Sequence, residues 1–192
     1  MSGAAHKPTV DLSFTHRWQA EVLQARPLIL PARHFVYPNE AEEVERGALE
    51  VLIRPEGNDG QKFLATCALG FRDPAVPTGL WSAPKPEELC AVAGGYVYMI
   101  DTTAPERFTM IAYRPVLAIV PVVAEGLLLF VGHHSILAWG REGQAWESEK
   151  LSDEGVTIAG VENGVLRGTG WEMRGDRETR FALDLRTGTL IS

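Results

Sequence analysis

Apolar segments along this chain are short, usually four to six residues, and they are separated by turn residues. Residues 94–101 begin with two glycines, continue as Tyr-Val-Tyr-Met-Ile and end at an aspartate. Residues 126–132 and 164–168 also open with glycine and continue as a short apolar run, and residues 181–188 end in an Asp-Leu-Arg-Thr-Gly turn. Short apolar runs between glycine and polar turns predict β-strands.

Most of these segments form adjacent pairs, which predicts antiparallel hairpins. Asn163-Gly164 is the strongest signal, because both residues tolerate the positive φ that a tight hairpin turn needs. No segment predicts a long helix. The predicted pairs are 48–53 with 61–66, 96–100 with 108–113, 116–120 with 127–131, 136–139 with 144–146, and 156–159 with 165–168.

The strands over 96–100 and 127–131 are apolar at every position, so we expect both of their faces to be covered. The units start near Phe63, Gly95, Gly126 and Gly164, at spacings of 32, 31 and 38 residues. Such periods are typical of stacked β units, each of which needs a neighbour to bury its face. The predicted fold is mainly β, with antiparallel blade-like repeats in a partial β-propeller-like arrangement or a stacked β-sheet sandwich.

The first third of the chain does not repeat. Residues 1–12 predict a loose tail, 14–23 are ambiguous between a short helix and an irregular strand, and prolines at 27, 31 and 38 favour short edge strands over 28–30 and 34–37. Residues 39–46 are compatible with one helical turn capped by Asn39 or with a solvated loop. We therefore predict a tail with short irregular elements over 1–46 and an antiparallel β domain of about four blade-like units over 47–192.

Two stretches carry a resemblance to a known type of repeat. Residues 127–146 resemble a quinoprotein-type β-propeller blade, in which a Gly-containing turn precedes a strand that bears Trp146. Residues 181–188 are similar to the aliphatic-Asp-x-x-Thr-Gly turn of WD-type and quinoprotein repeats, and 161–188 resemble the tail of a family of uncharacterised bacterial proteins. The resemblance covers residues 90–191 and implies a fold, with no quinone site. Uneven spacing leaves an incomplete ring, a sandwich and a ring-completing dimer open.

Composition and charge narrow the function. The 192 residues suit one domain, or one domain with a small appendage. They hold 25 acidic and 18 basic residues, a net charge of −7, and no run of four basic residues. This excludes a nucleic-acid or anionic-membrane surface, which needs clustered Lys and Arg. The most apolar stretch, 116–132, is interrupted by Pro121, Glu125 and Gly126, so we expect no membrane helix.

The start of the chain predicts no signal peptide, and the expected location is the cytoplasm. Cys67 and Cys90 lie in apolar strand-like settings. We interpret them as buried free thiols, with a Cys67–Cys90 disulfide or a reactive thiol as the alternatives.

His133-His134 is the most prominent candidate for chemistry. Adjacent residues of a strand face opposite sides, so the two rings share a ligand only if they lie at a turn. Zinc sites space their ligands by two to four residues and add others elsewhere. We therefore predict turn or surface histidines, with no metal. Neither a nucleophile elbow nor a phosphate or dinucleotide loop is present, and no cofactor is expected.

Trp139 and Trp146 flank one turn and are predicted to pack between sheets. Trp81, in the proline-rich stretch 71–89 that predicts a long ordered loop, and Trp171, near Arg174, are predicted to make exposed contacts. We expect a soluble, non-enzymatic binding or interaction module with a protein partner and a homodimeric state. The alternative is a small-ligand-binding protein or enzyme whose site lies near His133, His134, Trp81 and Trp171.

Overall fold

The computed structural model describes residues 7–38, 46–57 and 61–191. It confirms a mainly β protein built from several antiparallel sheets. Within the described residues no α-helix occurs, and η2 (Val123–Glu125) is a 3-10 turn. No helix in this part of the chain is long and apolar enough to cross a membrane. The chain divides into two compact units, Met1–Pro115 and Val116–Ser192.

One sheet of the first unit has the order β1-β6-β7-β8-β9. Its central strands, β6 (Gly79–Ser82), β7 (Glu88–Ala93) and β8 (Tyr96–Asp101), are antiparallel, and β9 (Phe108–Met110) continues the pattern. At the other edge, β1 (Thr9–Asp11) runs parallel to β6. Val97 to Ile100 are all buried, which confirms that both faces of this apolar strand are covered.

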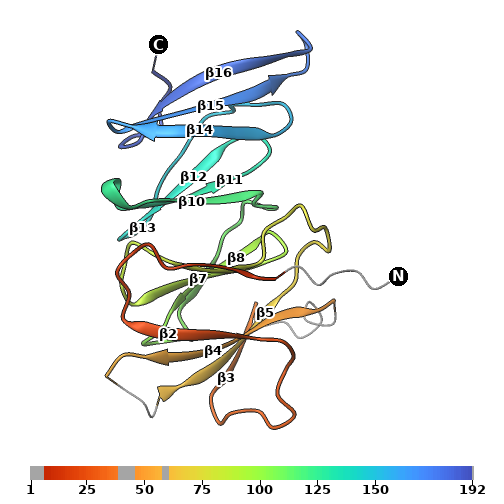
Figure 1. Ribbon diagram of the computed structural model, residues 1–192, viewed down its shortest axis with the longest axis vertical. Coiled ribbons are helices and arrows are strands. Elements are labelled where there is room, and N and C mark those ends of the chain that lie inside the picture. Colours follow the sequence, from red (N-terminus) through yellow and green to blue (C-terminus); the bar gives the residue numbers. More distant parts are fainter. Residues whose placement is uncertain (1–6, 39–45, 58–60, 192) are drawn as a thin grey trace. The chain divides into compact units, whose positions relative to one another are not determined.

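The second sheet of this unit has the order β2-β4-β5-β3. The predicted hairpin forms between β4 (Ala48–Pro55) and β5 (Phe63–Ala68), with β2 (Trp18–Leu23) antiparallel to β4 and β3 (His34–Tyr37) parallel to β5. Figure 1 shows this sheet as a layer next to β7 and β8. Alternate residues of the two sheets share one core, which includes Val51, Ile53, Phe63, Leu89, Tyr98 and Ile100.

In the second unit, β10 (Ala118–Val122), β11 (Leu127–Val131), β12 (Ile136–Gly140) and β13 (Gly143–Glu147) form an antiparallel meander in chain order. All five residues of β11 are buried, as its composition predicts. Fully burying a Leu or Phe side chain contributes about 1.5–3 kcal/mol, so this central strand is a major source of stability.

The last sheet consists of β14 (Val156–Glu162), β15 (Val165–Glu172) and β16 (Arg177–Asp184). Asn163 (φ 51°) and Gly164 (φ 74°) close the β14–β15 hairpin in the left-handed conformation that the sequence predicts. In Figure 1 these strands form a second layer against β10–β13. Side chains of both layers share a core that includes Leu129, Ile136, Trp146, Leu166, Leu183 and Leu185.

The predicted aspartate turn after β16 packs on this core. Asp184 Oδ1 accepts a hydrogen bond from the Arg186 N–H (2.8 Å), and Trp146 Nε1–H donates to the Leu185 carbonyl (2.7 Å). Gly188 has φ +71°, and a Cβ there would lie 2.4 Å from the Trp146 ring. The turn therefore needs glycine both for its backbone conformation and for its contact with the indole.

The structure confirms some predictions for the N-terminal half and differs from others. The ambiguous stretch 14–23 contains strand β2, and residues 34–37 form the predicted strand β3. Residues 28–30 form no strand, and their three aliphatic side chains are exposed between Pro27 and Pro31. Residues 1–46, which we separated as a tail with irregular elements, supply strands to both sheets of the first unit. The alternatives for 39–46 lie outside the described residues except at Arg46.

Candidate functional site

The structure divides the predicted site residues between the two units. Trp81 lies in β6 of the first unit and is 4% exposed, so the expectation of an exposed contact in a long loop is wrong. Between Pro77 and Pro84, the four residues Gly79–Ser82 are enough to form a strand that pairs with β7. His133, His134, Trp171 and Arg174 all belong to the second unit.

His133 and His134 form the turn between β11 and β12, with both side chains exposed. Their ring centroids are 6.1 Å apart. The His133 carbonyl accepts from the Gly155 N–H (2.9 Å), and the His134 carbonyl accepts from the Leu151 N–H (2.7 Å). His134 Nδ1–H donates to the Ser152 carbonyl (3.1 Å). The turn therefore holds the segment 151–155, which leads from β13 toward β14.

Ser152 is the centre of this junction and is 4% exposed. Its Oγ accepts hydrogen bonds from the N–H groups of Trp171 (2.8 Å) and Glu154 (3.1 Å) and donates to the Gly155 carbonyl (2.7 Å). The Asp153 N–H donates to the Trp171 carbonyl (2.7 Å). Both the N–H and the C=O of Trp171 are thus hydrogen-bonded. The Ser152 hydroxyl therefore has a structural role, which the sequence alone did not indicate.

Asp153 extends the junction to the turn that follows β15. Its carboxylate accepts from Lys150 Nζ (2.5 Å) and from the Met173 N–H (2.8 Å). The hydrogen bond from Lys150 is the main cause that lowers the pKa of Asp153, followed by that from Met173. The neighbouring Arg174 is exposed in this turn.

A pocket of about 340 Å³ lies on the face of β14–β16 that points away from the core of the second unit. Trp171 pairs across the strands with Glu178, and Thr169 pairs with Thr157, so all four side chains share this face. The Trp171 side chain is 37% exposed. Gly155 also lines the pocket, and a Cβ at this glycine would meet no atom within 4 Å, so the space next to it is open.

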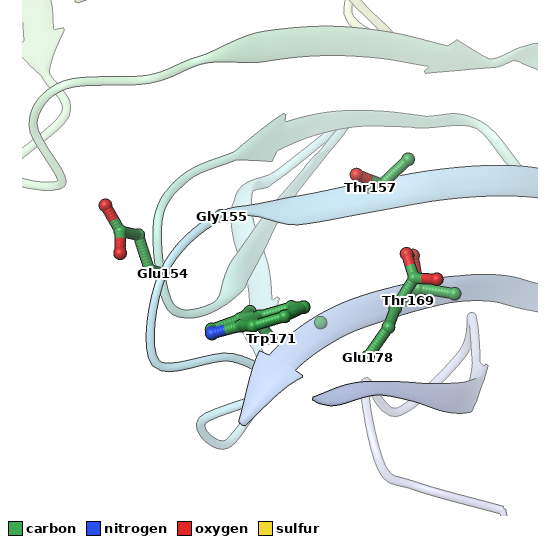
Figure 2. Close-up of a pocket in the computed structure, with 7 residues that line it drawn as sticks. Glu154, Gly155, Thr157, Thr169, Trp171 and Glu178 are labelled. Atoms are coloured by element: carbon green, nitrogen blue, oxygen red, sulfur yellow. The ribbon is translucent and has the colours of Figure 1, made fainter. Parts of the chain in front are cut away.

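Figure 2 shows the arrangement of the lining residues. The Trp171 indole lies between Glu154 on one side and Thr169 and Glu178 on the other. Thr169 Oγ1–H donates to Glu178 Oε1 (2.7 Å), which fixes the carboxylate and occupies the hydroxyl proton. The pocket offers an aromatic face with carboxylate oxygens at its edge, a combination that suits binding of a flat or cationic group.

Two other hollows belong to the first unit, and some of their lining side chains already pair with other groups. The pocket of about 450 Å³ near β8 and β9 is lined by Lys85, Asp101 and Arg107, and both basic side chains form ion pairs with Asp101. In the pocket of about 350 Å³ near β2, Trp18 is buried and its Nε1–H donates to the Glu88 carbonyl. We therefore place the candidate site at Trp171.

A polar cluster on the β2-β4-β5-β3 sheet is also internally satisfied. Buried Glu50 accepts from Arg26 Nε (2.8 Å) and from Thr66 Oγ1 (2.6 Å). Because the Thr66 hydroxyl has one proton, it accepts from His34 Nε2–H (2.8 Å). Thr66 has no exposed surface, and Arg26, in the loop after β2, is anchored to this network by its bond to Glu50.

Trp171, which the sequence analysis singled out, lines the pocket on β14–β16, and the groups around it that were not predicted as site residues are Ser152, Asp153, Glu154, Thr157, Thr169 and Glu178. Alternation along β15 does place Thr169 and Trp171 on one face. The described residues contain no group of three or more His, Cys, Asp or Glu that could hold a metal. No protein-family model and no curated protein matches this chain.

Proposed function

We propose that this chain is a non-enzymatic binding module that contacts a protein partner through the outer face of β14–β16. The proposal rests on one observation: Trp171 is partly exposed while its N–H and C=O are both hydrogen-bonded to the segment 152–153. An aromatic side chain on a fixed backbone position provides contact area at low entropic cost, and Trp is enriched at binding hot spots.

The alternative, a small-ligand or enzyme site at His133 and His134, has one feature in its favour, the exposure of both rings. It is the weaker proposal because the turn carbonyls and the His134 Nδ1–H are used to hold residues 151–155. Replacing both histidines by alanine tests this. Unchanged stability with loss of a metal or ligand would favour the alternative.

The main proposal is tested by affinity capture with the tagged full chain and two variants. We expect a stoichiometric partner with the wild type, and its loss with Trp171→Ala. Val123→Ala is the matched control, since Val123 is an exposed apolar residue (51%) of the same unit outside the pocket. Equal recovery of the partner by Trp171→Ala and wild type, at similar thermal stability, would refute the assignment of the surface.

We also propose that the sheets are blade-like repeats of a partial propeller and that the chain forms a homodimer in the cytoplasm. The Asp184 turn on Trp146 and the chain-order meander β10–β13 support the blade interpretation. Free, buried Cys67 and Cys90 are compatible with a reducing compartment. A monomeric mass in light scattering would contradict the dimer.

A further inference from the structure

We propose that the Trp171 pocket binds an arginine side chain of a partner protein, with the guanidinium stacked on the indole and paired with Glu178. This inference rests on the proposed function and names the chemistry that its surface recognises. The described residues that line the pocket include two carboxylates, Glu154 and Glu178, and no basic side chain.

The hydrogen-bonding capacity of the pocket selects a donor. Glu154 and Glu178 only accept when ionised, and the Thr169 proton is already given to Glu178 Oε1. Glu178 Oε2 remains to accept from a ligand. A guanidinium has five N–H donors and no acceptor, so it matches this set better than a ligand that must also accept.

The geometry favours a planar cation. Glu178 is the cross-strand neighbour of Trp171, so a carboxylate lies beside the indole. Among the side chains that take part in cation–π contacts, Arg is found more often than Lys and Trp is the best acceptor. Arg also stacks flat on aromatic rings while its fork reaches a carboxylate.

Charge on the rest of the unit has the same sign. Apart from Glu154 and Glu178, residues 116–192 contain nine acidic and seven basic side chains. Arg180 lies two residues from Glu178 on the same face and, within the described part of the chain, makes no ion pair with it. Arg180 would repel a bound cation, which predicts that removing its charge strengthens binding.

The test uses the full chain and a short Gly-Ser peptide with one central arginine, together with its citrulline and lysine analogues. Citrulline keeps the planar shape without the charge, and lysine keeps the charge without the plane. The readout is the indole Nε1–H signal of Trp171 in NMR spectra, identified by its absence in Trp171→Phe. We expect the arginine peptide to shift this signal and to bind at least about fivefold more tightly than either analogue.

Three variants keep the assignment falsifiable. Glu178→Gln retains an oxygen for Thr169 and should weaken arginine binding about fivefold or more, while Arg180→Gln should tighten it about twofold. Glu162→Gln makes the same change on an exposed residue outside the pocket and should have no effect. Binding of the arginine peptide should also weaken as salt is raised.

Equal binding of the arginine and citrulline peptides, or of the arginine and lysine peptides, would overturn the proposal. So would a Trp171 shift produced by cellohexaose and not by arginine, which would indicate a carbohydrate site. If the arginine peptide fails while Trp171→Ala still loses the captured partner, only the ligand chemistry is wrong. If both experiments fail, the proposed function is wrong as well.

Discussion

Replacing Ser152 by alanine should loosen Trp171 without removing any side chain from the pocket. Ser152 Oγ accepts the N–H groups of Trp171 and Glu154 and donates to the Gly155 carbonyl. Glu154 is exposed, so water can replace the bond to its N–H. The Trp171 N–H and the Gly155 carbonyl both lose their hydrogen bond to the buried Ser152 hydroxyl. A buried polar group that is left unsatisfied costs about 1–3 kcal/mol. We expect a local destabilisation of about 2 kcal/mol.

Amide hydrogen exchange of Trp171, measured by NMR, reports this opening directly. A loss of about 2 kcal/mol corresponds to roughly 30-fold faster exchange, because 1.4 kcal/mol is a factor of ten. Ser148→Ala is the control: this buried serine accepts from the Ile136 N–H (3.0 Å), so its loss should affect Ile136 and leave Trp171 protected. Unchanged protection of Trp171 in Ser152→Ala would show that the hydroxyl does not fix the site.

Two further predictions concern the first unit. Cys67 and Cys90 are fully buried, and burial raises the pKa of both thiols, so a thiol reagent at about pH 8 should label neither in the folded chain and both in urea. A rapidly labelled thiol without denaturant would contradict their burial. For Asp101, burial raises the pKa, but the hydrogen bonds from Thr103 and the charges of Lys85 and Arg107 outweigh it and lower the pKa below 3.8. Its stabilisation is therefore present above pH 3.8 and lost as the pH falls through the lower, folded value. The urea midpoint of wild type should fall more on acidification than that of Asp101→Asn, and parallel curves for the two would refute this role.

Local chemistry predicted five antiparallel pairs, β4–β5, β8–β9, β10–β11, β12–β13 and β14–β15, and missed others, among them β6–β7 and β15–β16. Asn163-Gly164 identifies its turn because few other pairs adopt positive φ together. The prolines predicted β3 as a short edge strand, but neither its parallel partner β5 nor the strand β1 was predicted, because β1 and β3 pair with strands far along the chain and no adjacent turn signals the pairing. The proline-rich context of Trp81 misled us for a related reason. Proline excludes a long regular element, but the short strand Gly79–Ser82, which lies between Pro77 and Pro84, still pairs with β7.

The pocket depends on a feature of register that composition does not encode. The hairpin turn pairs Glu162 with Val165 and Val161 with Leu166, and a regular ladder from there would place Ile158 opposite Thr169. A bulge between Ile158 and Gly160 shifts the pairing by one residue, so that Thr157 opposes Thr169 and Ile158 turns to the core. A one-residue shift exchanges the two faces of a strand. The polar side of the pocket on β14 therefore exists because of this bulge, and the partial burial of Ile158 against the core favours it.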